Sequence, residues 1–226
     1  MRYPTIRVFI QARMSSARFP GKVLAPLAGQ PVIMRVISQV AQVIPADRIT
    51  LATSSETSDD PLASYVGEMG FTVFRGPLDN VFERFHACAK EFPCDWFFRI
   101  CGDSPLLDPR ILSLMLSYAD RLDADLVTNV QVRSFPKGHS AEMLRTESFI
   151  KIDPARLSAE EAEHLTKVYY HHPHEFNIIN IESGDPSLAQ VCYTVDTIED
   201  LLRLERSLQV EPGPGTAETL RPNEQR

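Results

Sequence analysis

The chain has 226 residues, 43% of them hydrophobic and 23% charged, a composition ordinary for a water-soluble globular protein. Its net charge of -7 excludes a general attraction to nucleic acid, and no apolar run reaches the length of a membrane span. The N-terminal residues lack a signal-peptide pattern and the four cysteines form no Cys-x-x-Cys pair. We therefore expect a cytoplasmic protein with buried, reduced thiols and no zinc site.

The first predicted strand is a short apolar run at 8–10, and a loop of small and basic residues follows it. The loop ends at Pro20-Gly21, a turn dipeptide, and a helical pattern begins soon after, with Pro31 suited to its first turn. Such a loop can hold a polyanion, because its amides and the helix N-terminus donate hydrogen bonds while cations supply charge. The loop carries three cations, which suit a triphosphate: Arg13, Arg18 and Lys22.

Two interpretations of this basic loop stay open. Surface arginines and lysines are usually solvated charges, and the loop lacks the spacing of a P-loop or of a Gly-x-Gly-x-x-Gly fingerprint. In open α/β sheets, however, ligands bind at the carboxyl ends of strands, which is where this loop begins. Phosphate binding is therefore a hypothesis that the spacing alone does not decide.

The segment from Gln11 to Lys22, QARMSSARFPGK, closely resembles the opening motif of the cytidylyltransferase family. That family includes the enzymes that make CMP-sialic acid and CMP-KDO, and the chain most resembles the branch named for spore-coat polysaccharide biosynthesis. Further matches extend to about Leu208. The resemblance implies that the loop binds nucleotide through its cations and through Ala12, Ser15 and Ser16.

The next elements alternate between helix and strand. The second strand is predicted over 48–53, the following helix begins at Asp60-Pro61, and the third strand covers 71–74. In the family the end of the second strand forms part of the base and ribose pocket, which implies nucleotide contacts for Thr53 and Ser54. A polar loop with local Ser and Thr turns is the alternative. The first helix has a buried face at Val32, Ile33, Val36, Ile37 and Val40.

After the third strand, Arg75, Gly76 and Arg84 match a family motif of Arg-Gly, a short acidic segment and a helix that carries Arg. Asn80 stands where an acid is usual, and Asp79 is predicted to cap the helix. The resemblance implies nucleotide contacts for Arg75 and Gly76, where the missing Cβ lets the backbone approach a base. Arg84 is expected to contact the sugar substrate or, alternatively, to be an exposed helix charge.

The fourth predicted strand, 96–101, ends beside two aspartates with different expected roles. Asp108 fits the N-cap of the next helix. Asp103 lies at the carboxyl end of a central strand, before the next helix begins, so it is not needed as a cap. A carboxylate at this position, near a bound triphosphate, can hold Mg²⁺. The pattern Arg-x-x-Gly-Asp-x-Pro, which begins at Arg99, resembles the family's metal-binding strand end and implies nucleotide contacts for Arg99. Ser104 replaces the usual Cys.

A fifth strand is predicted over 125–130, and segment 134–144 resembles the family's Phe-Pro-Lys-Gly segment near the sugar. The resemblance implies that Lys137 and Glu142 bind the sugar, although Ser140 replaces an expected Asp.

Ser158 and Glu161 form a capping box that opens a further predicted helix. His164 on this helix resembles the histidine of a substrate-facing family motif, His-Val-Thr. Three later histidines suggest a metal site, but they bracket a proline without any thiolate, and a solvated helix C-terminus is the better interpretation. They are His171, His172 and His174.

Late strands are predicted over 177–181 and 191–195. Thr197 and Asp200 can cap the final helix, which leaves Asp196 at a strand end without a capping role. The pattern Val-Asp-Thr-x-Glu-Asp-Leu resembles the family. Its first Asp, Asp196, is implied to be the second metal carboxylate beside Asp103.

Strands alternate with helices throughout, which predicts an α/β fold with a mostly parallel central sheet flanked by helices. The resemblance implies that residues 1–210 form a single Rossmann-like nucleotidyltransferase domain, and the polar, proline-containing composition of 211–226 predicts a disordered tail. The expected reaction is CTP-dependent synthesis of a CMP-activated sugar for surface glycan biosynthesis, with release of pyrophosphate. Arg13, Lys22 and Asp103 are the candidate catalytic residues, and Mg²⁺ on Asp103 and Asp196 is the expected cofactor.

Alternative functions remain at this point. Another nucleotidyltransferase or a glycosyltransferase would share the fold, and a non-catalytic nucleotide-binding module would bind without turnover. The expected partners are CTP and a sugar, with no nucleic acid and no membrane, and a homodimer is left open.

Overall fold

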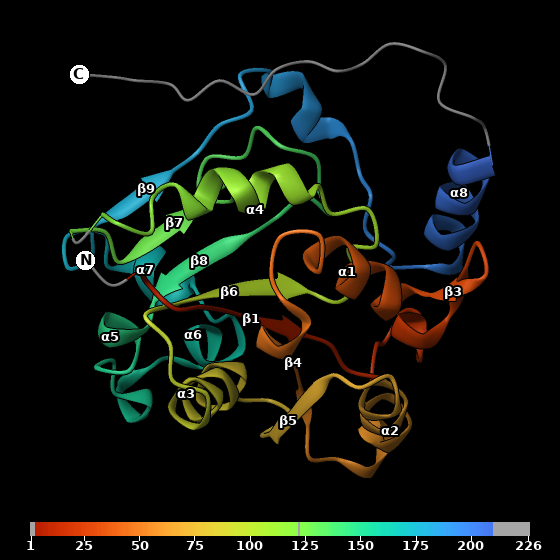
Figure 1. Ribbon diagram of the computed structural model, residues 1–226, viewed down its shortest axis with the longest axis horizontal. Coiled ribbons are helices and arrows are strands. Elements are labelled where there is room, and N and C mark those ends of the chain that lie inside the picture. The colour runs from red at the N-terminus through yellow and green to blue at the C-terminus, as the bar shows by residue number, and fades with distance from the viewer. Residues whose placement is uncertain (1–2, 122, 210–226) are drawn as a thin grey trace.

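The computed structural model describes residues 3–121 and 123–209, which build a seven-stranded sheet with helices on both faces (Figure 1). The strand order is β5-β4-β1-β6-β8-β7-β9. Strands β5, β4, β1 and β6 are parallel, β8 is antiparallel between β6 and β7, and β9 is parallel to β7. The predicted α/β fold with a mostly parallel sheet is confirmed. The strands of this sheet are β1 (Ile6–Gln11), β4 (Ile49–Ser54), β5 (Thr72–Gly76), β6 (Trp96–Cys101), β7 (Leu126–Thr128), β8 (Glu142–Arg145) and β9 (Ile178–Asn180).

Two helical layers cover the sheet, because its central strands are apolar on both faces. In β1, Val8 and Ile10 pack with helices α1, α2 and α4, whereas Phe9 packs with α3, α5 and α7 on the other face. This alternation is the period-two pattern of a doubly buried strand. The helices are α1 (Val32–Val40), α2 (Asp60–Glu68), α3 (Val81–Glu91), α4 (Pro109–Leu116), α5 (Thr146–Phe149), α6 (Ala159–Glu163), α7 (Lys167–His171) and α8 (Ile198–Gln209).

A small hairpin and the last helix close one end of the molecule. Strands β2 (Pro26–Leu27) and β3 (Gln30–Pro31) form the hairpin, against which α8 packs. Leu27, Val195 and Leu201 belong to the cluster of buried side chains between them. Figure 1 shows α8 beside this hairpin, and an ion pair between Arg18 and Asp196 brings the segment just before α8 to the loop that follows β1.

One strand was not predicted and one strand prediction was wrong. Segment 134–144 received no secondary-structure prediction, yet its end forms β8, which pairs with both β6 and β7. Segment 191–195 was expected as a strand but lies outside the sheet, where it makes only a bridge between Lys137 and Cys192. The order in the middle of the sheet therefore comes from long-range pairing rather than from hydrophobic alternation.

Helix boundaries differ from prediction at two places. The capping box of Ser158 and Glu161 is confirmed, but the helix that it opens stops at Glu163, and a second helix, α7, carries Tyr169 and Tyr170. The cap of α3 is Asn80 rather than Asp79, because the Asn80 side chain accepts the Glu83 amide.

No helix within 3–121 and 123–209 combines the length and the apolar composition needed to cross a bilayer. The tail expected over 211–226 lies outside the described residues.

Candidate active site

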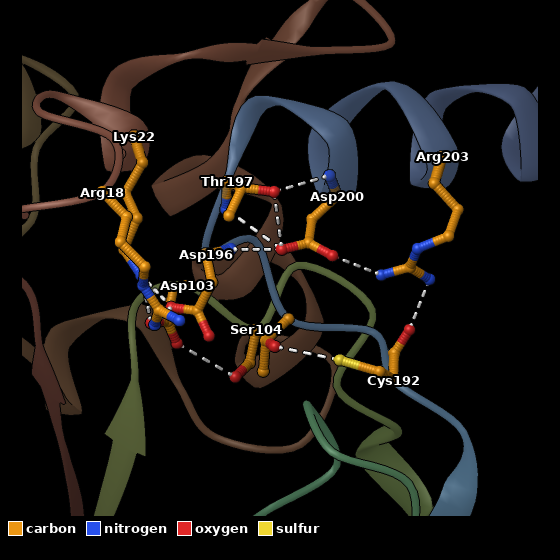
Figure 2. A network of polar contacts seen from close by, with 10 residues as sticks. Arg18, Lys22, Asp103, Ser104, Cys192, Asp196, Thr197, Asp200 and Arg203 are labelled. Atoms are coloured by element: carbon orange, nitrogen blue, oxygen red, sulfur yellow. Dashed lines mark hydrogen bonds and ion pairs between the residues drawn. The ribbon is translucent and has the colours of Figure 1, made fainter.

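Three side chains from distant parts of the chain meet at the carboxyl edge of the parallel strands (Figure 2). The Lys22 ammonium donates to Asp103 Oδ2 at 2.7 Å and to Asp196 Oδ1 at 2.9 Å. Arg18, whose side chain is 67% exposed, lies 3.0 Å from the same Asp196 oxygen. The structure therefore brings together two of the predicted phosphate-binding cations and both predicted metal carboxylates.

The loop after β1 delivers Lys22 to this position. Gly21 adopts a left-handed backbone conformation with φ of 76°, and Lys22 then opens a short 3-10 helix (Lys22–Leu24). Burial opposes the charge on Lys22, but the carboxylates of Asp103 and Asp196 outweigh it and raise its pKa above the usual value. Lys22 is therefore a buried, charged ammonium between two acids.

Asp103 and Asp196 are neighbours because a backbone hydrogen bond joins the segments that carry them. Asp103 follows β6, as predicted, whereas Asp196 follows an extended segment outside the sheet. The Val195 amide donates to the Asp103 carbonyl at 2.9 Å, which ties the two segments together.

The first turn of α8 holds the Asp196 backbone and leaves its side chain free for Lys22. Asp200 accepts the amides of Asp196 and Thr197, and Thr197 Oγ1 accepts the Asp200 amide. Arg203 pairs with Asp200 at 3.0 Å, as Figure 2 shows. The predicted capping role of Thr197 and Asp200 is therefore confirmed.

Two further arginines lie near this edge without a carboxylate partner. Arg13 makes no hydrogen bond or ion pair with any residue that the structure describes. Arg84 is 1% exposed, so it is not an exposed helix charge, and its Nη1 donates to the Pro77 and Leu78 carbonyls. Burial, together with the nearby charge of Arg13, lowers the pKa of Arg84 to about 10. An anion would relieve this concentration of positive charge.

The end of β4 is held by a residue that the sequence interpretation missed. Thr53 and Ser54 donate their hydroxyls to the buried carboxylate of Asp59. Arg75 donates to the Ser54 carbonyl and pairs with Asp60 at 2.7 Å. These predicted nucleotide contacts thus have structural partners within the wall of the site. Their common signal in the sequence is a strand that ends in hydroxyl residues shortly before an acid at a helix start.

A buried polar network lies under the other half of the edge. Arg99 donates to Gln11 Oε1 and pairs with Glu142 Oε2 at 3.1 Å, while Tyr170 donates to Glu142 Oε1 at 2.7 Å. Tyr170 also contacts the Thr128 hydroxyl at 3.0 Å. Burial and the Glu142 charge raise the pKa of Tyr170 above its usual range, so this hydroxyl is a neutral donor. Gln11 and Tyr170 were not predicted, because nothing local in the sequence links them to Glu142.

Two glycines allow close approach in the walls of the site. A Cβ on Gly102 would lie 2.7 Å from Ala12 Cβ, so only glycine lets the ends of β6 and β1 approach this closely. A Cβ on Gly76 would lie 2.9 Å from Arg84 Cγ. Gly76 therefore makes room for the buried Arg84 side chain.

Other predicted residues lie apart from the Lys22 cluster. Ser15 is exposed in the loop, while the Ser16 amide donates to the Met14 carbonyl. Lys137 is exposed, and its backbone forms hydrogen bonds with segment 191–195. His164 is exposed at the end of α6.

The late histidines and the cysteines have structural surroundings. His171 and His172 contact Glu161 Oε1 at 3.1 and 3.2 Å at the end of α7. Among the described residues, no group of three or more His, Cys, Asp or Glu side chains is arranged around a metal position. The thiols are free, and only Cys88 is fully buried, so the expectation of buried thiols was wrong for Cys94, Cys101 and Cys192, which are partly buried.

Comparison with known proteins gives consistent matches. The family described as cytidylyltransferase matches residues 7–201. The spore coat polysaccharide biosynthesis protein SpsF of Bacillus subtilis (strain 168) is 31% identical over 203 residues, which cover 86% of this chain and 82% of SpsF. The 3-deoxy-manno-octulosonate cytidylyltransferase of Chlorobium chlorochromatii is 33% identical over 109 residues, 48% of this chain and 43% of that protein.

Solved structures share the architecture. A cytidylyltransferase from Leptospira borgpetersenii serovar Hardjo-bovis superposes with a TM-score of 0.86 at 25% identity, over 93% of this chain and 89% of that one. A CMP:2-keto-3-deoxy-manno-octonic acid synthetase complexed with CTP gives a TM-score of 0.70 at 19% identity, over 92% of this chain and 100% of that one. At 19% identity, the similarity to this synthetase supports a shared fold and nothing further.

Proposed function

Since the chain belongs to the cytidylyltransferase family and is therefore a nucleotidyltransferase enzyme, we propose that it transfers the cytidylyl group of CTP to a sugar. The anomeric hydroxyl attacks the α-phosphorus and loses its proton, the bond from the α-phosphorus to the bridging oxygen breaks, and pyrophosphate leaves. The product is a CMP-activated sugar, which we assign to surface glycan synthesis by analogy with SpsF, named for spore coat polysaccharide biosynthesis.

The observation that carries this proposal is the position of Lys22 between Asp103 and Asp196, where Arg18 contacts the same Asp196 oxygen. Phosphoryl-type transfer needs mainly positioning and neutralisation of charge, and these side chains supply both. Arg13, Arg18 and Lys22 would bind the phosphate oxygens, with charge-assisted hydrogen bonds stronger than neutral ones.

The two carboxylates fit a divalent cation. Lys22 contacts one oxygen of each, and the side chains of Asp103 and Asp196 are 26% and 36% exposed. The second oxygen of Asp103 accepts only a long hydrogen bond, 3.4 Å, from the Ser104 hydroxyl, which leaves room for a ligand. Magnesium is commonly held by one or two carboxylates together with substrate phosphates and water, so a third protein ligand is not required. Asp103 and Asp196 would hold the ion, which would supply neutralisation of the triphosphate charge.

The acceptor side of the site is proposed to involve Lys137, Glu142 and His164. Both oxygens of Glu142 are already occupied by Arg99 and Tyr170, so Glu142 would act by fixing those two side chains rather than by binding a hydroxyl through a free oxygen. Lys137 and His164 are exposed and available for direct contact. Arg84 would act on the nucleotide side by holding the Pro77 and Leu78 carbonyls.

Pyrophosphate release tests the proposal. Purified protein with Mg²⁺ should release pyrophosphate from CTP, and much less from UTP, ATP or GTP, only when an accepted sugar is present. Acidic and neutral sugars are tested side by side, with Asp103→Asn as the inactive control. Equal turnover of UTP would favour another nucleotidyltransferase, transfer from a UDP-sugar would indicate a glycosyltransferase, and CTP binding without turnover across the sugar panel would contradict the proposed reaction.

A further inference from the structure

Asp59 is a buried carboxylate whose position suggests a role beyond its own helix. It is 0% exposed and has no ion-pair partner among the described residues. It is the N-cap residue of α2, yet its side chain makes no capping hydrogen bond to that helix. A buried carboxylate is costly unless its oxygens are satisfied, so the groups that do satisfy Asp59 reveal what it holds.

The Asp59 carboxylate joins the end of β4 to the loop after β1. Its Oδ1 accepts the Met14 amide at 2.6 Å. Its Oδ2 accepts the Thr53 hydroxyl and the Ser54 amide, each at 3.1 Å, and also the Ser54 hydroxyl. Every one of these contacts is with a donor.

Met14 connects Asp59 to the rest of the loop through hydrogen bonds of its own backbone. Its amide is held by Asp59, while its carbonyl accepts the amides of Ser16 and Gly21, both at 2.9 Å. Gly21, with its left-handed backbone, directly precedes Lys22. A continuous chain of hydrogen bonds and one peptide bond therefore runs from Asp59 through Met14 and Gly21 to Lys22.

We propose that Asp59 is a positioning residue that fixes the loop over 14–22 and so sets the place of the Lys22 ammonium. The functional part of this inference rests on the proposed binding of CTP by Lys22. Loop geometry matters because displacement of a catalytic group by about 1 Å can cost a hundredfold in rate. The carboxylate is needed, because an amide offers a single acceptor oxygen and must turn its NH₂ toward Met14 or Ser54.

Asp59→Asn is the test, with two readouts. In the protein without nucleotide, amide hydrogen exchange at Met14 and Gly21 should accelerate at least about tenfold, while amides of β6 keep their protection. The dissociation constant for CTP, measured by calorimetry, should rise by at least about tenfold. Unchanged exchange at both amides would overturn the proposal.

Leu62→Ala is the matched control for a general loss of stability. Leu62 lies on the same helix, is fully buried and has an apolar side chain, so its truncation lowers the melting temperature and removes no hydrogen bond to the loop. Its CTP dissociation constant should stay within about twofold of the wild type. If Leu62→Ala weakens CTP binding as much as Asp59→Asn does at equal loss of melting temperature, Asp59 is merely structural.

Gly21→Ala tests the other end of the chain and covers a failure of Asp59→Asn to fold. The substitution strains the backbone at φ of 76° and disturbs the bond to Met14. It should weaken CTP binding alone, and the double variant should lose less than the product of the two single losses. Unchanged CTP affinity in Gly21→Ala, or strictly multiplicative losses, would refute the chain through Met14.

The readouts also separate the two proposals. If the wild type binds no CTP but the exchange results hold, the proposed function fails and the positioning role stands. If the wild type binds CTP and Asp59→Asn binds it equally well, only the Asp59 proposal fails.

Discussion

Replacing Lys22 by methionine removes one charge from the centre of the site and nearly keeps the side-chain volume. The ammonium lies 2.7 Å from Asp103 and 2.9 Å from Asp196. At an effective dielectric constant near 20, a unit charge pair at this distance attracts by about 6 kcal/mol, most of which desolvation offsets. Breaking a buried ion pair costs about 3–5 kcal/mol. Because the acids are 26% and 36% exposed, water screens them, and we expect a loss of about 2–3 kcal/mol in unfolding free energy.

The same variant should change two binding affinities in opposite directions. CTP binding should weaken by about 1–3 kcal/mol, the range for a lost charge-assisted hydrogen bond. Binding of Mn²⁺, as a probe of the Mg²⁺ site without nucleotide, should strengthen by roughly tenfold, because the cation that occupies Asp103 and Asp196 is gone and two adjacent carboxylates favour a new one. We therefore expect Lys22 to compete with a metal ion for the two acids.

Electron paramagnetic resonance of free Mn²⁺, calorimetry with CTP and thermal unfolding provide the three measurements. Lys151→Met is the matched control, because Lys151 pairs with Glu147 on an exposed surface, where both side chains are about 70% accessible. It should change none of the three. Mn²⁺ binding that is unchanged or weaker in folded Lys22→Met would refute the competition between Lys22 and the metal.

The remaining predictions concern the acids of the site and the stability of the α6–α7 region. Asp103→Asn and Asp196→Asn should each lower pyrophosphate release at least about a hundredfold. Because both residues act on one cation, the double variant should lose less activity than the product of the two single losses. Strictly multiplicative losses with an unaltered Mg²⁺ dependence would contradict this. Glu142→Gln and Lys137→Ala should raise the sugar KM about tenfold while the CTP dissociation constant stays within about twofold, and a collapse of CTP affinity would show that the two halves of the site are not separate. Hydrogen bonds from the Ser158 backbone and hydroxyl lower the pKa of Glu161 to about 2 from 4.5. Because the folded-state pKa is depressed, this stabilisation is complete above about pH 4.5 and is lost as the pH falls toward 2. The melting temperature of Glu161→Gln should therefore depend less on pH in that window, and an unchanged dependence would contradict the assignment.

Local patterns in the sequence were sufficient for most helices and for the central strands. Strand β6 covers the predicted 96–101, since an apolar run buried on both faces has few alternatives. Asp108 caps α4, because a side chain before a proline at the first helical position reaches the next amide.

Pairing between distant segments could not be predicted in the same way. Strand β8 has the sequence Glu-Met-Leu-Arg, whose first residue is charged and nearly fully buried. That burial is possible only because Arg99 neutralises the charge of Glu142 and Tyr170 donates a hydrogen bond to it. Both partners come from other elements of the fold. Segment 191–195 has a strand-like composition, but it pairs with no strand of the sheet and forms only a bridge between Lys137 and Cys192.

The site was predicted in its residues more than in its contacts. Asp103, Asp196, Arg18 and Lys22 were singled out by their places after strands and in the basic loop, and the structure brings them within hydrogen-bond distance. The position of Lys22 between the two aspartates was not predicted. The place of a carboxylate after a strand indicates which edge of the sheet it reaches, but it does not indicate which side chain lies between two such carboxylates. Asp59 was missed since its partners, above all Met14, depend on loop geometry.

The charges of the site explain why a metal ion and a nucleotide should bind together. Arg18 and Lys22 contact Asp103 and Asp196, and Arg13 belongs to the same basic loop, so the three cations of the loop and the two carboxylates leave a single positive charge. A triphosphate brings more negative charge than this surplus, and Lys22 cannot serve the phosphates fully while it also neutralises both acids. A divalent cation on the two aspartates would release Lys22 for the phosphates and supply the missing charge at once. Nucleotide and metal should therefore each raise the affinity for the other, by the same factor, as reciprocal coupling requires.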